Sequence, residues 1–296
     1  MIPSDWLAAF AVFAEDASLS GAARRLHLSQ PAVHAQLKKL QELLGVPLYR
    51  RAGRGLALTR EGEEVAAFAR RMDESCTELA GRLRGEQGER RIVLAAGAGA
   101  IVDVIAEGLR AFVRGWDGRL EVVTCDARAA IAAVVRGEAH AGVAALGPAA
   151  EAIDPVVEAR AITEVEQALV VPKAHRLATR RTVRLRDLAG ERLVVPPSGR
   201  PQRVALEAAF RQAGVELRPS ATATGWDVTL RLVDLGIGLG IVNASCRTPK
   251  TLRKKPLREL PPVRYVALVR RGARADVNRL VHALVEHGGA WRERTM

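Results

Sequence analysis

The sequence predicts an α/β protein in three parts: a helical N-terminal part with a short hairpin, one long helix, and two lobes of alternating strands and helices. Three observations support this prediction. Residues 18–62 read as two short helices, a tight turn and a basic hairpin. Apolar residues then recur at helical spacing between Val65 and Leu83. From Arg91 onward, short apolar runs alternate with helical stretches, which is typical of strand–helix–strand units.

The first predicted helix covers residues 5–16. Trp6, Phe10 and Phe13 are spaced four and three residues apart, so they lie on one face of a helix. This apolar face can cover the core formed by the residues that follow.

The second and third predicted helices are joined by a tight turn at His27 and Leu28. The second helix covers about residues 20–26, and the third runs from Ser29 to about residue 44. Ser29 is a good N-cap, and Pro31 loses no hydrogen bond in a first turn. Gly45 is a suitable residue to end the helix.

The third helix has two different faces. One is an apolar stripe, predicted to be buried, of Val33, Leu37, Leu40 and Leu44. The other is short, polar and basic, and such a face can enter the major groove of DNA; it consists of Pro31, His34, Ala35, Lys38 and Lys39. Residues 18–60 contain eight Lys or Arg and one acid, Glu42, a net charge of +7. The alternative is a helical hairpin with a solvated basic face.

This pattern resembles the winged helix-turn-helix of the LysR-type transcriptional regulators. The matching residues are Phe10, Phe13, Glu15, Ser18, Ala22, Ala23, Leu26, Ser29, Gln30, Pro31, Ala32, Val33, Gln36, Leu40, Leu44, Gly45, Leu48, Arg51, Leu58, Thr59 and Gly62. Three positions depart from the family pattern: His34 replaces the usual Ser, Gln41 the usual Glu, and Tyr49 the usual Phe. Because His34 lies on the presumed reading face, its presence bears on the preferred DNA sequence.

The resemblance implies double-stranded DNA as a partner. The expected DNA-binding residues are Arg24, Ser29, Gln30, Pro31, His34, Gln36, Lys38, Lys39, Arg51 and Arg54. Arg54 lies between two glycines at the tip of a predicted hairpin, residues 46–58, from which it can reach phosphate or a narrow minor groove. The alternative for Arg54 is a solvated turn residue.

A long helix is predicted from Thr59, a suitable N-cap, to about Arg84. A helix with one apolar stripe cannot stay exposed, so it needs a partner surface. In the family this segment is the linker helix that forms a dimer, and the resemblance further implies a tetramer. The alternative is packing on its own chain. The stripe consists of Val65, Phe68, Met72, Cys76, Leu79 and Leu83.

The remaining chain is predicted to form two α/β lobes. Expected strands are 92–96, 120–124, 140–145, 166–171, 193–195, one within 236–243, and 265–269; expected helices are 101–114, 129–136, 204–213, 227–235 and 277–286. The alternation predicts parallel sheets with crossover helices. The layout resembles the effector domain of the same family, whose fold is similar to periplasmic binding proteins.

The resulting domain boundaries follow from two expected crossings between the lobes, near 162–167 and 261–267. The DNA-binding domain is 1–62 and the linker helix is 63–90. The first effector lobe takes 91–163 with 267–296, and the second takes 164–266.

The expected effector site lies where strands end in the two lobes. Free backbone N–H groups, hydroxyl groups and one Arg suit a small organic anion. For each residue alone an ordinary turn is an equal alternative, and Arg200 lies in a generally Arg-rich stretch. The candidates are Gly97, Ala98, Gly99, Ala100 and Thr124 in the first lobe, and Ser198, Gly199, Arg200, Thr224 and Trp226 in the second.

Two other classes of function fit the sequence less well. An enzyme is disfavoured because the chain has no phosphate-binding loop, nucleophile elbow or metal-ligand pair, so we expect no catalytic residue, metal or cofactor. A solute-binding protein would share the two lobes, but it would not explain residues 1–85.

Composition is consistent with a regulator. The net charge of +12 favours a polyanionic partner, and the three scattered cysteines predict no disulfide framework. With no leader pattern and no run of eighteen apolar residues, we expect a cytoplasmic protein without membrane contact. RNA polymerase is a further expected partner if the protein activates transcription.

Overall fold

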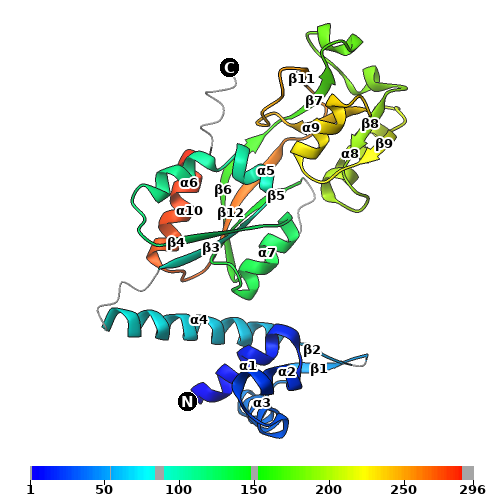
Figure 1. Ribbon diagram of the computed structural model, residues 1–296. Helices are drawn as coiled ribbons and strands as arrows, with labels where there is room; N and C mark the ends of the chain where they lie inside the picture. Colours follow the sequence, from blue (N-terminus) through cyan, green and yellow to red (C-terminus); the bar gives the residue numbers. More distant parts are fainter. Residues whose placement is uncertain (1, 54, 84–89, 148–152, 289–296) are drawn as a thin grey trace. The chain divides into compact units, whose positions relative to one another are not determined.

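The computed structural model describes residues 2–53, 55–83, 90–147 and 153–288 (Figure 1). The chain divides into two compact units. The first comprises Met1–Val93 with the short segments Asp117–Glu121 and Ala132–His140. The second comprises Leu94–Trp116, Val122–Ile131 and Ala141–Met296.

The N-terminal elements confirm the predicted helix-turn-helix with a hairpin (Figure 1). Ser18 and Ser29 cap two of the helices, since their hydroxyl oxygens accept hydrogen bonds from Gly21 N–H at 3.0 Å and Ala32 N–H at 3.3 Å. Gly45 ends the third helix with φ at 72°, as expected for a glycine cap. The elements are α1 (Ser4–Asp16), α2 (Leu19–Leu26), α3 (Gln30–Leu44), β1 (Tyr49–Ala52), β2 (Gly55–Leu58) and α4 (Arg60–Leu83).

The core of this region is built from the predicted apolar faces. Phe10 and Phe13 of α1 and the α3 stripe residues Val33, Leu37 and Leu40 are fully buried, whereas Leu44 is only partly buried. Full burial of each large side chain contributes about 1.5–3 kcal/mol. This core fixes α3 against α1 and α2, so that the opposite face of α3 stays in solvent.

The apolar stripe of α4 is used in two ways. Val65 and Met72 pack against the N-terminal core, whereas Phe68 and Cys76 are exposed in the single chain. The side chains of Leu79 and Leu83 lie outside the described residues. Part of the predicted seam therefore packs on its own chain, and part stays open to another surface.

The first large sheet has the strand order β4-β3-β5-β12-β6. Helices α6 and α10 pack together on one face of it (Figure 1). The elements are β3 (Arg91–Ala96), α5 (Ala98–Asp103), α6 (Ala106–Val113), β4 (Arg119–Thr124), α7 (Ala127–Arg136), β5 (Ala141–Leu146), β6 (Val157–Val165), β12 (Val263–Arg270) and α10 (Ala275–His287).

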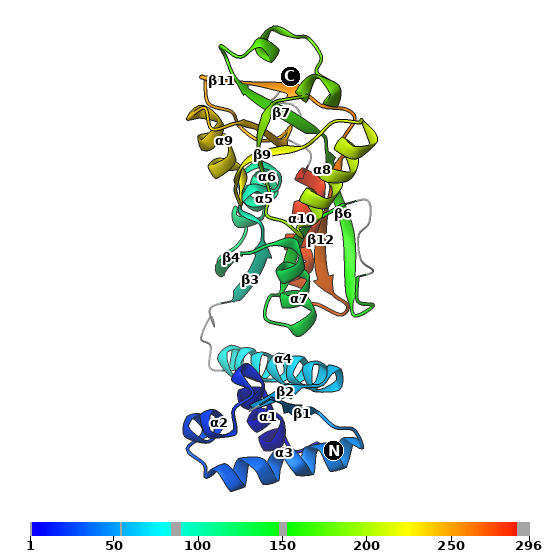
Figure 2. The same ribbon diagram turned by 90° about the vertical axis from the view of Figure 1, so that its right-hand side faces the viewer.

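The second large sheet has the strand order β11-β7-β10-β8-β9. Its two faces carry separate cores: Leu193 and Val195 pack with residues of α8, whereas Val194 packs with residues of α9. The two helices therefore cover opposite faces (Figure 2). The elements are β7 (Gln167–Pro172), η1 (Arg176–Thr179), η2 (Leu185–Leu188), β8 (Arg192–Val195), α8 (Pro201–Gln212), β9 (Arg218–Thr222), α9 (Trp226–Asp234), β10 (Leu239–Asn243) and β11 (Leu252–Pro256).

Two crossings connect the sheets, between β6 and β7 and between β11 and β12. They touch each other, since the Gln167 side-chain amide donates to the Pro261 carbonyl oxygen at 2.9 Å. This arrangement confirms the two-lobed α/β fold class.

The prediction that both sheets are parallel is correct only in part. Strand β3 runs parallel to β5, and β8 runs parallel to β9 and β10, but both sheets are mixed. Strand β12 runs antiparallel to β5 and β6, and β7 runs antiparallel to β10 and β11. The alternation rule describes strands joined by helices within a lobe. Strands that enter a sheet from the other lobe arrive without a crossover helix, so the rule does not fix their direction.

Other differences concern individual elements. The helix expected over 101–114 is two helices, α5 and α6, with a break at Val104 and Ile105. Three further strands, β6, β9 and β11, were not predicted from the sequence. These three are edge strands with mixed apolar and polar side chains, so they lack the continuous apolar run of a central strand.

The helices of the described chain include none that is long and apolar enough to cross a membrane.

Candidate functional sites

The face of α3 opposite the core is open to solvent. Pro31, His34, Ala35, Lys38 and Lys39 are all exposed, as predicted from the periodicity. Because the Ser29 cap and the adjoining turn fix the start of α3, these side chains project from a rigid helix.

The basic side chains of this region differ in their present contacts. Arg25 forms a two-pronged ion pair with Glu15, with N–O distances of 2.7 and 2.9 Å. The Lys38 ammonium lies 3.7 Å from Glu42, and that of Lys39 lies 5.9 Å from the ring centre of Trp6. These exposed contacts are weak, so both lysines can turn toward phosphate.

The other expected DNA contacts lie in different settings. Arg24, Gln30 and Arg51 are exposed. Gln36 is partly buried, and its Oε1 atom is enclosed without a hydrogen bond among the described residues. This places Gln36 beside the core side of α3. Arg54 lies outside the described residues.

A hollow of about 390 Å³ lies beside the start of α3. It is lined by the start of α2, by Gln30 and by Gly55 and Leu56 of β2. The structure thus brings the first turns of two helices and the hairpin to one surface.

The first-lobe candidates gather at the ends of β3 and β4. Gly97 precedes α5, and Thr124 is exposed at the end of β4. The two strand ends are adjacent, since Cys125 N–H donates to the Ala96 carbonyl oxygen at 3.0 Å.

The second-lobe candidates gather in the same way at the ends of β8 and β9. Ala223 N–H donates to the Val195 carbonyl oxygen at 2.9 Å, so the loops that follow these strands begin side by side. Ser198, Gly199 and Thr224 are exposed. The predicted site residues of this lobe therefore lie on one edge of its sheet.

Two contacts join the loops of one lobe to those of the other. The Arg200 guanidinium pairs with the Asp126 carboxylate, and both side chains are about 40% exposed. A Cβ atom on Gly99 would lie 2.5 Å from the ring of Trp226, so the glycine allows close contact with that ring. Sequence reasoning missed Asp126, although an acidic residue just before a helix and just after a strand end was a usable signal.

Asp126 is held as a carboxylate. Its pKa is lowered, first because Ala129 N–H donates to it at 2.9 Å and further because of Arg200; partial burial opposes the shift. One anion and one cation, each from a different lobe, are therefore in contact here.

A second hollow, of about 530 Å³, lies between α5 and the segment after β10, lined in part by Asp103, Cys246 and Lys254. Burial raises the pKa of Asp103, and the Cys246 thiol, which hydrogen-bonds to it, opposes that shift. Lys254 donates to the carbonyl oxygens of Ala244 and Cys246, the latter at 2.7 Å. Asp103 and Lys254 of this hollow are thus already bonded within the protein.

Cys246 does not have the surroundings of a reactive thiol. It is buried, and burial together with the nearby Asp103 carboxylate raises its pKa. In the described part of the chain, no group of three or more His, Cys, Asp or Glu side chains is placed to hold a metal ion.

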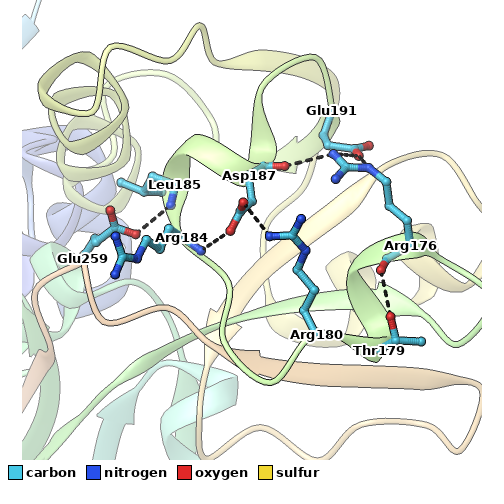
Figure 3. A network of polar contacts seen from close by, with 8 residues as sticks. All are labelled: Arg176, Thr179, Arg180, Arg184, Leu185, Asp187, Glu191 and Glu259. Carbon is cyan, nitrogen blue, oxygen red and sulfur yellow. Dashed lines mark hydrogen bonds and ion pairs between the residues drawn. The ribbon is translucent and has the colours of Figure 1, made fainter.

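Some arginines that precede Arg200 in the sequence belong to a structural network (Figure 3). Arg176 pairs with Glu191 at 2.7 Å, and Arg180 pairs with Asp187 at 3.0 Å. Asp187 also accepts from Arg184 N–H at 2.9 Å. These side chains stabilise the η1–η2 segment. Arg200 differs from them, because it contacts a residue of the other lobe.

Comparison with known proteins assigns the two parts of the chain. Residues 4–63 match the bacterial regulatory helix-turn-helix protein, lysR family, and residues 85–289 match the LysR substrate binding domain. The chain is 34% identical to the HTH-type transcriptional regulator TfdS of Cupriavidus pinatubonensis over 80% of each chain. It is 29% identical to the RuBisCO operon transcriptional regulator of Allochromatium vinosum, covering 80% of this chain and 78% of that one.

A solved structure supports the same assignment along the whole chain. The fold is similar to that of CbnR, a LysR family transcriptional regulator, with a TM-score of 0.56 and 25% identity over 95% of this chain and 99% of that one. The chain therefore belongs to the LysR family of DNA-binding transcriptional regulators, with an N-terminal helix-turn-helix followed by an effector-binding domain.

Proposed function

We propose that α3 enters the major groove of an operator and that its exposed face reads the sequence. The observation that carries this proposal is the solvent-exposed row of His34, Ala35, Lys38 and Lys39 on a capped helix whose other face is core. His34 lies among these residues and can donate to or accept from a base edge, so it is assigned to sequence reading. Lys38 and Lys39 are assigned to phosphate contacts.

The remaining DNA contacts are assigned to the flanking elements. Arg24 of α2 and Arg51 of β1 are exposed and supply positive charge on either side of α3. Ser29, Gln30 and Pro31 form the leading end of the helix. Arg54, at the hairpin tip, is proposed from the sequence alone to reach the minor groove or backbone. Gln36 is assigned to the DNA contact from its partly buried place on α3.

We further propose the domain boundaries 1–62, 63–90, 91–163 with 267–296, and 164–266. The linker helix is the dimer contact, and the dimers pair into a tetramer. The protein acts in the cytoplasm, and RNA polymerase is its partner at promoters that it activates.

The proposed effector is a small organic acid bound in the cleft between the lobes. Support comes from the two sets of strand-end loops that face one another and from Arg200, whose guanidinium can bind a carboxylate with two hydrogen bonds. The ligand can approach the backbone closely at Gly97, Ala98, Gly99 and Ala100. Hydroxyl groups come from Thr124, Ser198 and Thr224. The loop is shaped by Gly199, and an apolar wall is formed by Trp226.

Salt-dependent DNA binding tests the assignment of Lys38. The logarithm of the binding constant is expected to fall by about 0.9 per phosphate neutralised for each unit of log salt. Lys38→Ala should weaken binding to every duplex and reduce this slope by about one, as measured by fluorescence anisotropy between low and physiological salt. Arg25→Ala is the matched control, because Arg25 is already paired with Glu15. An unchanged slope with an altered sequence preference would move Lys38 from phosphate to base contact.

A further inference from the structure

The contact between Asp126 and Arg200 restricts the chemistry of the effector. Asp126 ends the loop after β4 and caps α7, whereas Arg200 directly precedes α8. One residue therefore comes from each lobe, and the pair spans the proposed effector site. A ligand carboxylate that binds the guanidinium of Arg200 must either displace this carboxylate or share the guanidinium with it.

The local charges make a simple acid a poor ligand. Asp126 keeps its charge because Ala129 N–H and Arg200 both stabilise the carboxylate, which lowers its pKa. The next cation of α8, Arg203, already pairs with Glu207 at 2.6 Å. A monocarboxylate on Arg200 would therefore place two anions on one guanidinium, or leave Asp126 without its cation.

A ligand with two opposite charges avoids this conflict. Its carboxylate can replace Asp126 on Arg200, and its ammonium group can replace Arg200 on Asp126. One ion pair is then exchanged for two, and each lobe holds one end of the ligand. Two crossings, which touch at Gln167 and Pro261, join the two lobes that hold these ends.

We propose that the effector is an amino acid, bound with its carboxylate on Arg200 and its ammonium group on Asp126. This inference rests on the proposed effector cleft and names the class of ligand that the cleft accepts.

The test uses the full-length protein and matched pairs of small molecules. The panel contains the twenty common amino acids, β-alanine and γ-aminobutyrate, each with the acid that lacks the amino group, such as propionate for alanine and glutarate for glutamate. Thermal shift identifies binders, and isothermal titration gives their affinities. At least one amino acid should bind about tenfold or more tightly than its amino-free partner, in line with the loss of one charge pair.

Substitution of Asp126 should shift the binding preference from the amino acid toward the acid that lacks the amino group. Asp126→Asn keeps an oxygen for Ala129 N–H, so the cap of α7 survives. It should weaken the amino acid about tenfold and strengthen the amino-free acid, which no longer competes with a carboxylate. Arg200→Gln should weaken both ligands. Arg218→Gln, which breaks an exposed pair with Glu216 in the same lobe, is the control and should change neither affinity. If Asp126→Asn lowers the melting temperature, Asp126→Ser provides the same cap and the same test.

Three outcomes overturn the inference: no amino acid binds, amino-free acids bind the wild type as tightly, or Asp126→Asn weakens both ligands alike. A wrong ligand class can be distinguished from a wrong binding site. If an amino-free acid binds in a way that depends on Arg200, the cleft stands and only the ligand class is wrong. If Arg200→Gln leaves every affinity unchanged, the proposed cleft fails as well.

Discussion

Single residues explain why the N-terminal elements dock as they do. Gly62, in the first turn of α4, lies so close to the preceding hairpin that a Cβ atom would stand 1.9 Å from the Leu48 carbonyl oxygen. No rotamer can relieve a contact made with backbone. A glycine at this position is therefore required for α4 to pack against the segment that leads into the hairpin.

Gly62→Ala should destabilise the N-terminal domain by about 1–3 kcal/mol, the usual cost of overpacking. Denaturant unfolding followed by circular dichroism measures this change. Gly115→Ala is the control, since a Cβ there meets nothing within 4 Å. Equal stability of the two variants would show that the close approach of α4 to Leu48 is not maintained in solution.

Asp103 predicts a specific dependence of stability on pH. Its pKa is raised, chiefly by burial, so the folded protein holds this proton to a higher pH than the unfolded chain does. The stabilising contribution is complete below the unfolded pKa of about 3.9 and is lost as the pH rises through the folded pKa. Asp103→Asn, which carries no such charge, should gain melting temperature relative to wild type as the pH rises above about 4. Parallel melting curves against pH would contradict this account.

At the scale of elements, periodicity predicted most of the helices and central strands. The α3 stripe and the caps at Ser29 and Gly45 could be predicted because helix faces and helix ends follow from local sequence. The edge strands β9 and β11 could not, because their mixed side chains make sense only beside a neighbouring strand. The break between α5 and α6 is likewise a tertiary effect, since Val104 and Ile105 are both buried.

The proposed effector site, too, could be predicted from the sequence only in part. Strand ends could be predicted, and with them Thr124, Ser198 and Thr224. The pairing of Asp126 with Arg200 could not, because it joins residues 74 positions apart and depends on how two lobes face each other. The role of the Arg-rich stretch was ambiguous in the sequence. Only the folded structure shows that Asp187 and Glu191 pair with arginines and so stabilise the η1–η2 segment.

The exposed part of the α4 stripe predicts self-association. Phe68 is 46% exposed, and Cys76 is exposed on the same side of the helix. Replacing both by Asp should leave the single chain folded but place unpaired charge in the dimer contact. Light scattering should then give a smaller mass than for wild type. Thr77→Asp is the control and should keep the wild-type mass, because Thr77 lies about 100° from Cys76 and about 180° from Phe68 around the helix. An unchanged mass in the double variant would exclude this face as the contact.

At the scale of the whole molecule, the chain combines a rigid DNA-reading head with a two-lobed sensor. As a member of a family of regulators, it is not an enzyme. The arrangement separates the two tasks: α3 is fixed by its own core, whereas the proposed effector site lies at loops from two lobes. Changes in the cleft should therefore alter the response to effector before they alter binding to DNA.

Selection of bound fragments from a genomic library by the purified protein tests whether α3 reads the DNA sequence. The wild type should enrich fragments that share one motif. His34→Ala should enrich a motif changed at the bases that His34 meets, while Lys38→Ala should keep the motif with lower recovery. If wild-type protein enriches no common motif, or if His34→Ala selects the same fragments with the same affinity, α3 does not read the sequence in the proposed way.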